Sequence, residues 1–237
     1  SEGSETLTAD VSDVAGNAAA TVTSSSFTVD RTATISAIAT SAFSWGSHLN
    51  ATEDNSNGTV SVTTSGVEDG QVVTITLNGA TYTANVSSNA ATVTITASGL
   101  QALSEGSETL TADVSDVAGN AAATVTSSSF TVDTTVPTIS AIATSAFSWG
   151  SHLNATEDNS NGTVSVTTSG VEDGQAVTIT LNGATYTANV SSNAATVTIT
   201  ASGLQALSEG SETLTADVSD VAGNAAATVT SSSFTVD

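Results

Sequence analysis

The chain has 237 residues, of which 23 are Asp or Glu and one is Lys or Arg, so its formal net charge is −22. A surface this acidic repels nucleic acids and anionic membranes, and neither is an expected partner. The sequence has no Cys and no run of about 18 apolar residues, which excludes disulfides, thiolate chemistry and a predicted membrane-spanning helix.

The chain begins with a segment that occurs three times. SEGSETLTADVSDVAGNAAATVTSSSFTVD starts at Ser1, Ser104 and Ser208, and a second segment, TISAIATSAFSWGSHLNATEDNSNGTVSVTTSGVEDGQ, starts at Thr34 and Thr138. A period of about 104 residues is that of a whole domain. We predict that residues 1–30 are the C-terminal part of a preceding repeat, and that residues 31–133 and 134–237 are complete repeats. Domains of 1–103 and 104–207 fit the period equally well, but Pro137 favours a short, stiff linker after Asp133.

Apolar residues that alternate with Thr or Ser predict the strands of the repeat at 134–237. In chain order, the predicted strands cover residues 138–142, 164–167, 177–181, 186–190, 197–199, 214–218 and 234–236. About seven strands in about 100 residues is typical of an immunoglobulin-like β-sandwich, so the expected fold is all-β, with such sandwiches in tandem. The Cys pair of antibody domains is missing.

Asp and Glu side chains concentrate in the predicted turns between these strands. One basic residue cannot neutralise them, and clustered carboxylates destabilise a compact fold by repulsion. Ca²⁺ removes this repulsion by taking about six to eight oxygen ligands from carboxylates, Asn side chains and backbone carbonyls. We therefore predict Ca²⁺ as the cofactor. The candidate ligands are Asp10, Asp13, Asn17, Asp30, Glu53, Asp54, Glu68, Asp69, Glu105, Asp113, Asp116, Asn120, Asp133, Glu157, Asp158, Glu172, Asp173, Glu209, Asp217, Asp220, Asn224 and Asp237.

Sandwich topology predicts which of these turns share an end, because alternate turns fall at opposite ends of the strands. The turns at 172–173 and 217–224 are expected where the repeat begins, and those at 157–161 and 209–212 at the other end. The linker after Asp133 then has acidic turns on both sides. An ion bound there would bridge both repeats and fix their angle.

Residues 157–162 allow two further interpretations. Their sequence, EDNSNG, resembles the start of an EF-hand loop, but Thr168 stands where the closing Glu would be. The Asn161-Gly162 pair alternatively predicts a plain hairpin turn.

Three motifs resemble a known family. VEDGQAVTITLNGATYTANV, LTADVSDVAGN and FTVDTTVP are similar to the bacterial immunoglobulin-like repeats of giant, type I-secreted RTX adhesins, over the whole repeat. The resemblance implies an extracellular extender on the bacterial surface, whose repeats are neighbours in one chain and are rigidified by Ca²⁺ to hold a distal ligand-binding domain away from the cell. Its calcium positions match Asp113, Asp116, Asn120, Asp133, Asp217, Asp220, Asn224 and Asp237.

The first junction, Asp30-Arg31-Thr32-Ala33, departs from the Asp-Thr-Thr-x-Pro of this family, so its geometry is expected to differ.

Two other classes of function compete with the extender. His48 and His152 lie in no catalytic motif, so neither an enzyme nor a small-molecule substrate is expected. An adhesive binding module, with homophilic, sugar or ice binding, is the stronger alternative. Outward Thr residues suit ice binding, but they are equally typical of any sandwich surface, and Phe147 and Trp149 are expected to pack in the core.

Overall fold

A computed structural model describes residues 2–237 of the chain. They divide into two compact units. Unit 1 comprises residues 2–47, 57–103 and 107–130, and unit 2 comprises residues 48–56, 104–106 and 131–237. The units do not follow the sequence repeats, because residues 48–56 and 104–106 of the first complete repeat cluster with the residues of the second.

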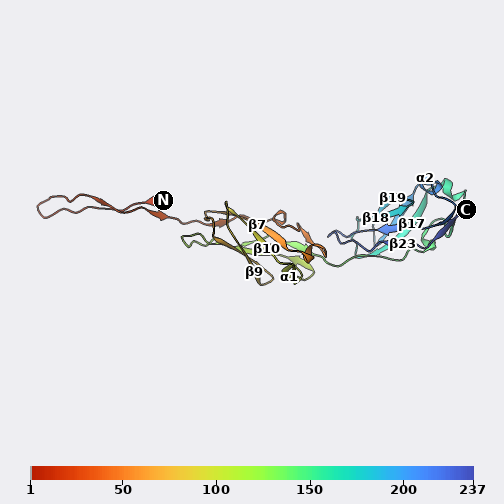
Figure 1. The fold of residues 1–237 in the computed structure, drawn as a ribbon, viewed down its shortest axis with the longest axis horizontal. Helices are drawn as coiled ribbons and strands as arrows, with labels where there is room; N and C mark the ends of the chain where they lie inside the picture. The colour runs from red at the N-terminus through yellow and green to blue at the C-terminus, as the bar shows by residue number, and fades with distance from the viewer. Residues whose placement is uncertain (1) are drawn as a thin grey trace. The chain divides into compact units, whose positions relative to one another are not determined.

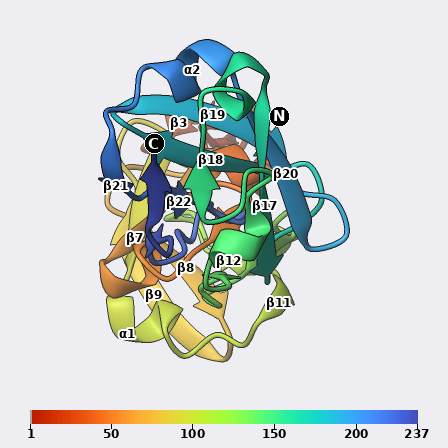
Figure 2. The same ribbon diagram turned by 90° about the vertical axis from the view of Figure 1, so that its right-hand side faces the viewer.

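Unit 2 contains three sheets of short strands (Figures 1 and 2), and in addition His48 and Leu49 pair in parallel with Thr131 and Val132. Strands β17 and β20 lie side by side over six residue pairs, and β18 pairs with both β19 and β22. All of these pairs are antiparallel, whereas β16 pairs with β24 in parallel. The sheet orders are β15-β17-β20, β16-β24-β21 and β19-β18-β22-β23. The elements are β6 (His48–Leu49), η2 (Glu53–Asn55), β15 (Thr138–Ile139), η3 (Thr144–Ala146), β16 (His152–Leu153), η4 (Glu157–Asn159), β17 (Gly162–Ser169), β18 (Ala176–Leu181), β19 (Ala184–Asn189), β20 (Ala194–Ile199), α2 (Ala201–Gln205), β21 (Gly210–Glu212), β22 (Thr215–Asp217), β23 (Val229–Thr230) and β24 (Phe234–Val236).

Unit 1 has the same kind of sandwich, preceded by a separate ribbon. The sandwich sheets are ordered β10-β7-β5 and β13-β12-β8-β9, and in the ribbon β1 pairs with β4 and β2 with β3. Strands β11 (Gly106–Glu108) and β14 (Phe130–Val132) span the boundary between the units. The remaining elements are β1 (Gly3–Glu5), β2 (Thr8–Ala9), β3 (Val22–Thr23), β4 (Phe27–Val29), β5 (Thr34–Ile35), η1 (Thr40–Ala42), β7 (Gly58–Ser65), β8 (Val72–Leu77), β9 (Ala80–Asn85), β10 (Ala90–Ile95), α1 (Ala97–Leu100), β12 (Thr111–Asp113) and β13 (Val125–Thr126).

The period-2 pattern places one face of each long strand in the core. In β18, Val177, Ile179 and Leu181 are at most 1% exposed. Phe147 stacks on Trp149 with ring centroids 5.1 Å apart, and Phe234 meets both rings edge-on at 5.4 and 5.5 Å. The all-β, immunoglobulin-like prediction is confirmed, as is the core position of this aromatic pair.

Several predicted elements differ in the structure. The strand predicted at residues 138–142 is limited to β15, and the long connection after it contains η3, β16 and η4. Helix α2 was not predicted; it begins after Thr200, whose Oγ1 accepts a hydrogen bond from the Gly203 amide at 3.2 Å. The α-helices found within residues 2–237 are four and five residues long, too short to cross a membrane.

The hairpin predicted at Asn161-Gly162 is wrong. Gly162 opens β17, and a Cβ there would lie 2.6 Å from the Trp149 ring, so packing selects the glycine. Asn161 Oδ1 accepts a hydrogen bond from the Ala201 amide at 3.0 Å. The hairpin turn lies instead at Asn182-Gly183, both with positive φ, between β18 and β19.

Candidate functional site

The turn from Asp220 to Asn224 is closed by its own side chains. Asp220 Oδ1 accepts a hydrogen bond from the Asn224 amide at 2.8 Å, and Oδ2 accepts one from Asn224 Nδ2 at 2.9 Å. Gly223 supplies the positive φ of 93° that the turn requires. Both Asp220 and Asn224 are buried. A short Asp-to-Asn spacing therefore produces a rigid turn without help from distant residues.

Asn224 also connects this turn to two other segments of unit 2. Its Oδ1 accepts a hydrogen bond from the Ala51 amide at 2.8 Å, and its Nδ2 donates to the Asp133 carbonyl at 2.8 Å. Asn50 Nδ2 donates to the Ala222 carbonyl at 3.0 Å. The side chain predicted as a metal ligand thus uses its amide for hydrogen bonds that tie residues 50–51, 133 and 220–224 together.

Four carboxylates of unit 2 act on one another at this place, and we call Glu105, Asp133, Glu172 and Asp220 the linker acidic cluster. Burial raises the pKa of Asp133, and the charges of Asp220, Glu105 and Glu172 raise it further, against the lowering effect of the Thr135 amide. The charged groups that act on Asp133 are all acidic, so the cluster concentrates negative charge.

Hydrogen bonds hold three of these carboxylates in place. Glu105 Oε1 accepts bonds from the Thr134 amide at 3.0 Å and the Thr134 hydroxyl at 2.6 Å, and these bonds lower the pKa of Glu105. Asp133 Oδ1 accepts from the Thr135 amide at 3.2 Å, and Glu172 Oε2 accepts from the Val221 amide at 2.9 Å. Within the described chain, each of these groups keeps its second carboxylate oxygen available as a ligand.

Two cavities show which predicted ligands share an end of the repeat. A cavity of 280 Å³ is lined by Asp133 and Glu172, and another of 180 Å³ by Asp158, Glu209 and Asp237. This grouping agrees with the arrangement expected from sandwich topology.

Unit 1 repeats these local contacts around Asp30. Asn120 Nδ2 donates to the Asp30 carbonyl at 3.1 Å, and the Val117 amide donates to Glu68 Oε2 at 3.0 Å. The Thr32 amide bonds Asp30 Oδ1 at 3.3 Å, as Thr135 does at Asp133. At the level of these hydrogen bonds, the Arg31 junction keeps the pattern of the other one.

Other candidate ligands bond to nearby donors. Each of nine predicted ligands accepts a hydrogen bond from one residue. These bonds are Asp10 from Thr21, Asp13 from Asn17, Glu53 from Asn50, Asp69 from Ser88, Asp113 from Thr124, Asp116 from Asn120, Glu157 from Asn154, Asp173 from Ser192 and Asp217 from Thr228. For Asp54, the contact is through the backbone, from its amide to the Asn50 carbonyl at 3.1 Å. These side chains stabilise turns and strand ends.

Sequence reasoning missed Asn50 and Thr134. Asn50 Oδ1 accepts hydrogen bonds from the Thr52 and Glu53 amides, while Glu53 Oε2 accepts one from the Asn50 amide. The spacing Asn-x-x-Glu is a capping-box pattern that could have identified this turn. The contact between Thr134 and Glu105 leaves no such signal, because it joins residues 29 positions apart.

The atoms of the linker acidic cluster that could bind a metal ion are all carboxylate oxygens, which suits a hard cation such as Ca²⁺. Across residues 2–237, however, three or more His, Cys, Asp or Glu side chains are nowhere gathered closely enough to hold a metal ion by themselves. Asn and backbone oxygens, or movement of the carboxylates, would have to complete such a site.

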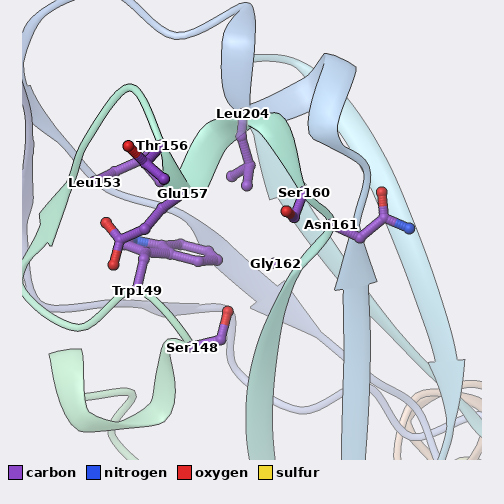
Figure 3. A pocket seen from close by; sticks show the side chains of 9 residues that line it. All are labelled: Ser148, Trp149, Leu153, Thr156, Glu157, Ser160, Asn161, Gly162 and Leu204. Atoms are coloured by element: carbon purple, nitrogen blue, oxygen red, sulfur yellow. The ribbon is translucent and has the colours of Figure 1, made fainter.

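A cavity of 320 Å³ lies beside Trp149, at the low end of the range for small-molecule sites (Figure 3). Figure 3 shows the side chains of Glu157, Ser148 and Ser160 around the Trp149 ring. The Trp149 Nε1 group is buried and has no hydrogen-bond partner in the described chain. Because the ring belongs to the aromatic core and the lining residues include no His, we interpret this cavity as part of the packing around Trp149.

Three solved structures similar to this chain all come from bacterial ice-binding adhesins. No protein-family model and no curated protein sequence matches the chain. A structure described as a Ca²⁺-stabilized adhesin that helps an Antarctic bacterium reach out and bind ice is 30% identical, over 99% of this chain and 57% of the other, with a TM-score of 0.48. A 1.5-MDa bacterial ice-binding adhesin is 29% identical, over 100% of this chain and 74% of the other, with a TM-score of 0.48.

A third relative is a single domain. It is a bacterial immunoglobulin-like domain from the M. primoryensis ice-binding adhesin, 31% identical over 44% of this chain and 98% of that domain, with a TM-score of 0.30. The sequence identity over nearly the whole domain confirms the resemblance that the motifs indicated. The chain belongs to the family of bacterial immunoglobulin-like adhesin repeats.

Proposed function

We propose that this chain is a stretch of the extender region of a bacterial cell-surface adhesin, in which Ca²⁺ stiffens the junctions between repeats. The stiffened repeats would hold a distal ligand-binding domain away from the cell. The observation that carries the proposal is the linker acidic cluster, in which burial, and after it the charges of three neighbouring carboxylates, raise the pKa of Asp133. The similar adhesin described as Ca²⁺-stabilized supports the choice of cation.

Ca²⁺ would be held by Asp133, Glu105 and Glu172, which keep oxygens available, with Asp220 close enough to add its charge. The ion supplies positive charge that removes the repulsion among these groups. It would also draw together segments that are distant in sequence, because the ligands come from residues 105, 133 and 172. Asn224 prepares this arrangement by fixing residues 51 and 133 to the 220–224 turn.

The affinity expected of extracellular modules is about 10⁻⁴ to 10⁻³ M. A chain with such sites would stay loose where free Ca²⁺ is scarce and stiffen in external fluid. This agrees with a role on the cell surface, which we propose together with export by type I secretion.

Small-angle scattering of the full chain, in Ca²⁺ and in excess chelator, tests the function. We expect a larger maximum dimension and a narrower distribution of dimensions with Ca²⁺, because the linker loses freedom. Mg²⁺ is the control ion, since it demands stricter octahedral geometry and gives up water reluctantly. Superimposable curves in chelator and in Ca²⁺ well above about 10⁻³ M would refute the proposal, because sites of the expected affinity would be filled there.

A further inference from the structure

Each complete repeat carries three copies of the pattern Asn-x-Ser/Thr with no Pro in the middle position, and we call each copy a sequon. This pattern is the acceptor motif of N-linked glycosylation, in which a sugar is joined to the side-chain nitrogen of Asn. A chain rich in Ser and Thr also produces the pattern by coincidence, so the structure has to separate usable sequons from unusable ones. The Asn residues of the six sequons are Asn50, Asn57, Asn85, Asn154, Asn161 and Asn189.

The first sequon of each repeat is held by its own hydrogen bonds. Asn50 uses both ends of its side-chain amide, because Oδ1 accepts a bond from the Thr52 amide at 2.9 Å and Nδ2 donates to the Ala222 carbonyl at 3.0 Å. Asn154 Oδ1 accepts a bond from the Thr156 amide at 2.9 Å. In both sequons the Asn side chain is fixed against its own turn, so a sugar could be attached only after the turn opened.

The second sequon of each repeat is fixed by packing. Asn57 Oδ1 accepts a hydrogen bond from the Ala97 amide, and Asn161 Oδ1 accepts one from the Ala201 amide, each at 3.0 Å. These bonds hold the Asn side chain against the first residue of α1 or α2. The middle residue is the glycine that opens β7 or β17, where a Cβ would lie 2.6 Å from a Trp ring. An enzyme would therefore have to lift the start of the strand away from the core.

The third sequon of each repeat is accessible. Asn85 is the last residue of β9 and Asn189 the last residue of β19, and both are exposed. Within residues 2–237, neither side chain makes a hydrogen bond. The Ser residues that complete the two sequons are exposed as well, whereas the Val between Asn and Ser is 2% exposed in each repeat. The buried Val anchors the segment, and the Asn and Ser side chains on either side of it face solvent.

The strands that carry these two Asn residues lie at sheet edges. Among the described residues, β9 pairs only with β8 and β19 only with β18. Folded proteins commonly protect such an edge with charged side chains or Pro. Both strands have the sequence ATYTAN, which contains neither, and the chain has no Lys. A bulky, soluble sugar at the end of each strand would supply that protection.

We propose that Asn85 and Asn189 are N-glycosylation sites that accept a hexose from a sugar nucleotide in the folded chain. In the transfer, Nδ2 forms a bond to the anomeric carbon of the hexose, and the bond from that carbon to the phosphate oxygen breaks. Nδ2 loses one proton, and the nucleoside diphosphate leaves. The proposal is independent of the proposed function, because neither Asn belongs to the linker acidic cluster.

The test incubates the folded full chain with a purified soluble glycosyltransferase that recognises sequons and with uridine diphosphate glucose. Peptide mapping by mass spectrometry then locates the added hexose. We expect transfer to Asn85 and Asn189 at least about fivefold faster than to the other four, since each of these must first lose at least one hydrogen bond. Synthetic peptides that span each sequon provide the intrinsic rates, and with them the advantage of these two Asn residues should disappear.

Ser191→Ala removes the third sequon of the second repeat and leaves Asn189 in place. We expect this variant to lose the hexose at Asn189 and to keep it at Asn85, which serves as the internal reference for a folded chain. Thr187→Ala is the matched control, because Thr187 is also exposed but lies outside the sequon. The control should be modified at the wild-type rate.

The protein purified from the cells that produce it should carry hexose on the peptides that contain Asn85 and Asn189. Unmodified masses for both peptides would overturn the proposal. Equal rates at all six sequons of the folded chain, after correction by the peptide rates, would overturn it as well.

Discussion

The fold raises the pKa of Asp133 and so favours the protonated form of this side chain. Its pKa lies above the ordinary value of 3.8, first because the group is partly buried and then because Asp220, Glu105 and Glu172 are negative. A raised pKa means that the folded state holds this proton more strongly than the unfolded state. The resulting stabilisation is complete below pH 3.8 and is lost as the pH rises through the folded value, so at neutral pH the ionised group is ready for a cation.

The substitution Asp133→Asn should therefore act in opposite directions with and without Ca²⁺. In chelator we expect the thermal midpoint to stay the same or rise slightly, with a gain below about 1 kcal/mol, because the cluster loses one charge at a solvent-accessible site. In Ca²⁺ the stabilisation by the ion should shrink. Calorimetric scans measure both effects, with Glu212→Gln as a control of equal charge change. A variant that keeps the full stabilisation by Ca²⁺ would rule out Asp133 as a ligand.

The pKa of Asp116 is shifted in the opposite direction, to a lower value. Burial raises its pKa, but hydrogen bonds from the Asn120 side chain and amide, and from the Gly119 and Ala118 amides, outweigh burial and lower it. The ionised group therefore stabilises the fold above pH 3.8, and this contribution is lost as the pH falls through the lowered value.

We expect the unfolding free energy of the wild type, in chelator, to fall more steeply than that of Asp116→Asn as the pH drops below about 4. Urea unfolding at each pH measures the two profiles. Parallel profiles would show that the ionised carboxylate adds nothing beyond the hydrogen bonds that Asn at this position can also make.

At the scale of single elements, β17 shows how one missing side chain shapes the repeat. Gly162 begins this strand where the Trp149 ring and Leu204 leave no room for a Cβ. The ring therefore lies against the start of the strand, and residues 157–159 before it form the 3₁₀ helix η4 rather than one arm of a hairpin.

Gly162→Ala should therefore destabilise the repeat by about 1–3 kcal/mol, since the added methyl group meets the ring and overpacks the core. The matched control is Ala176→Val, which adds more volume at an exposed position where the other repeat already has Val72, itself 49% exposed. The control should change stability by less than about 0.5 kcal/mol. Denaturant unfolding compares the two, and equal effects would contradict this account of Gly162.

How much of these elements the sequence predicts depends on how local their causes are. The centres of β17 and β18 were predicted, at residues 164–167 and 177–181, because alternation of apolar and polar residues has a clear physical origin in one buried face. The two-residue strand β16 was missed, since its parallel pairing with β24 depends on residues more than 80 positions away. Likewise, the 220–224 turn follows from its Asp and Asn, whereas the bond between Asn50 and Ala222 spans 172 positions and leaves no local pattern.

At the scale of the whole molecule, the net charge sets the electrostatic contribution to stability. A formal charge of −22 makes the folded chain repel itself, and this repulsion acts over about 10 Å at 0.1 M salt. Divalent ions and screening by monovalent salt both relieve it, but by different routes.

We expect NaCl to raise the thermal midpoint in chelator, and to raise it less in saturating Ca²⁺, where part of the charge is already neutralised. Differential scanning calorimetry at several NaCl concentrations measures the two slopes, and KCl in place of NaCl tests for ion-specific effects. A midpoint in chelator that does not respond to salt would mean that self-repulsion contributes little to stability.

The Asp-to-Asn turn has a consequence for the order of folding. Its hydrogen bonds lie within five residues, and the copy in the ribbon makes them too: Asp13 Oδ1 accepts the Asn17 amide at 2.8 Å although this turn is fully exposed. Hairpins close in about 1–10 μs, whereas β12 must find β8 across some 35 residues. We expect φ-values near one in the turn and near zero where β8 meets β12, so that each repeat folds by docking a preformed hairpin and the late docking step sets the rate.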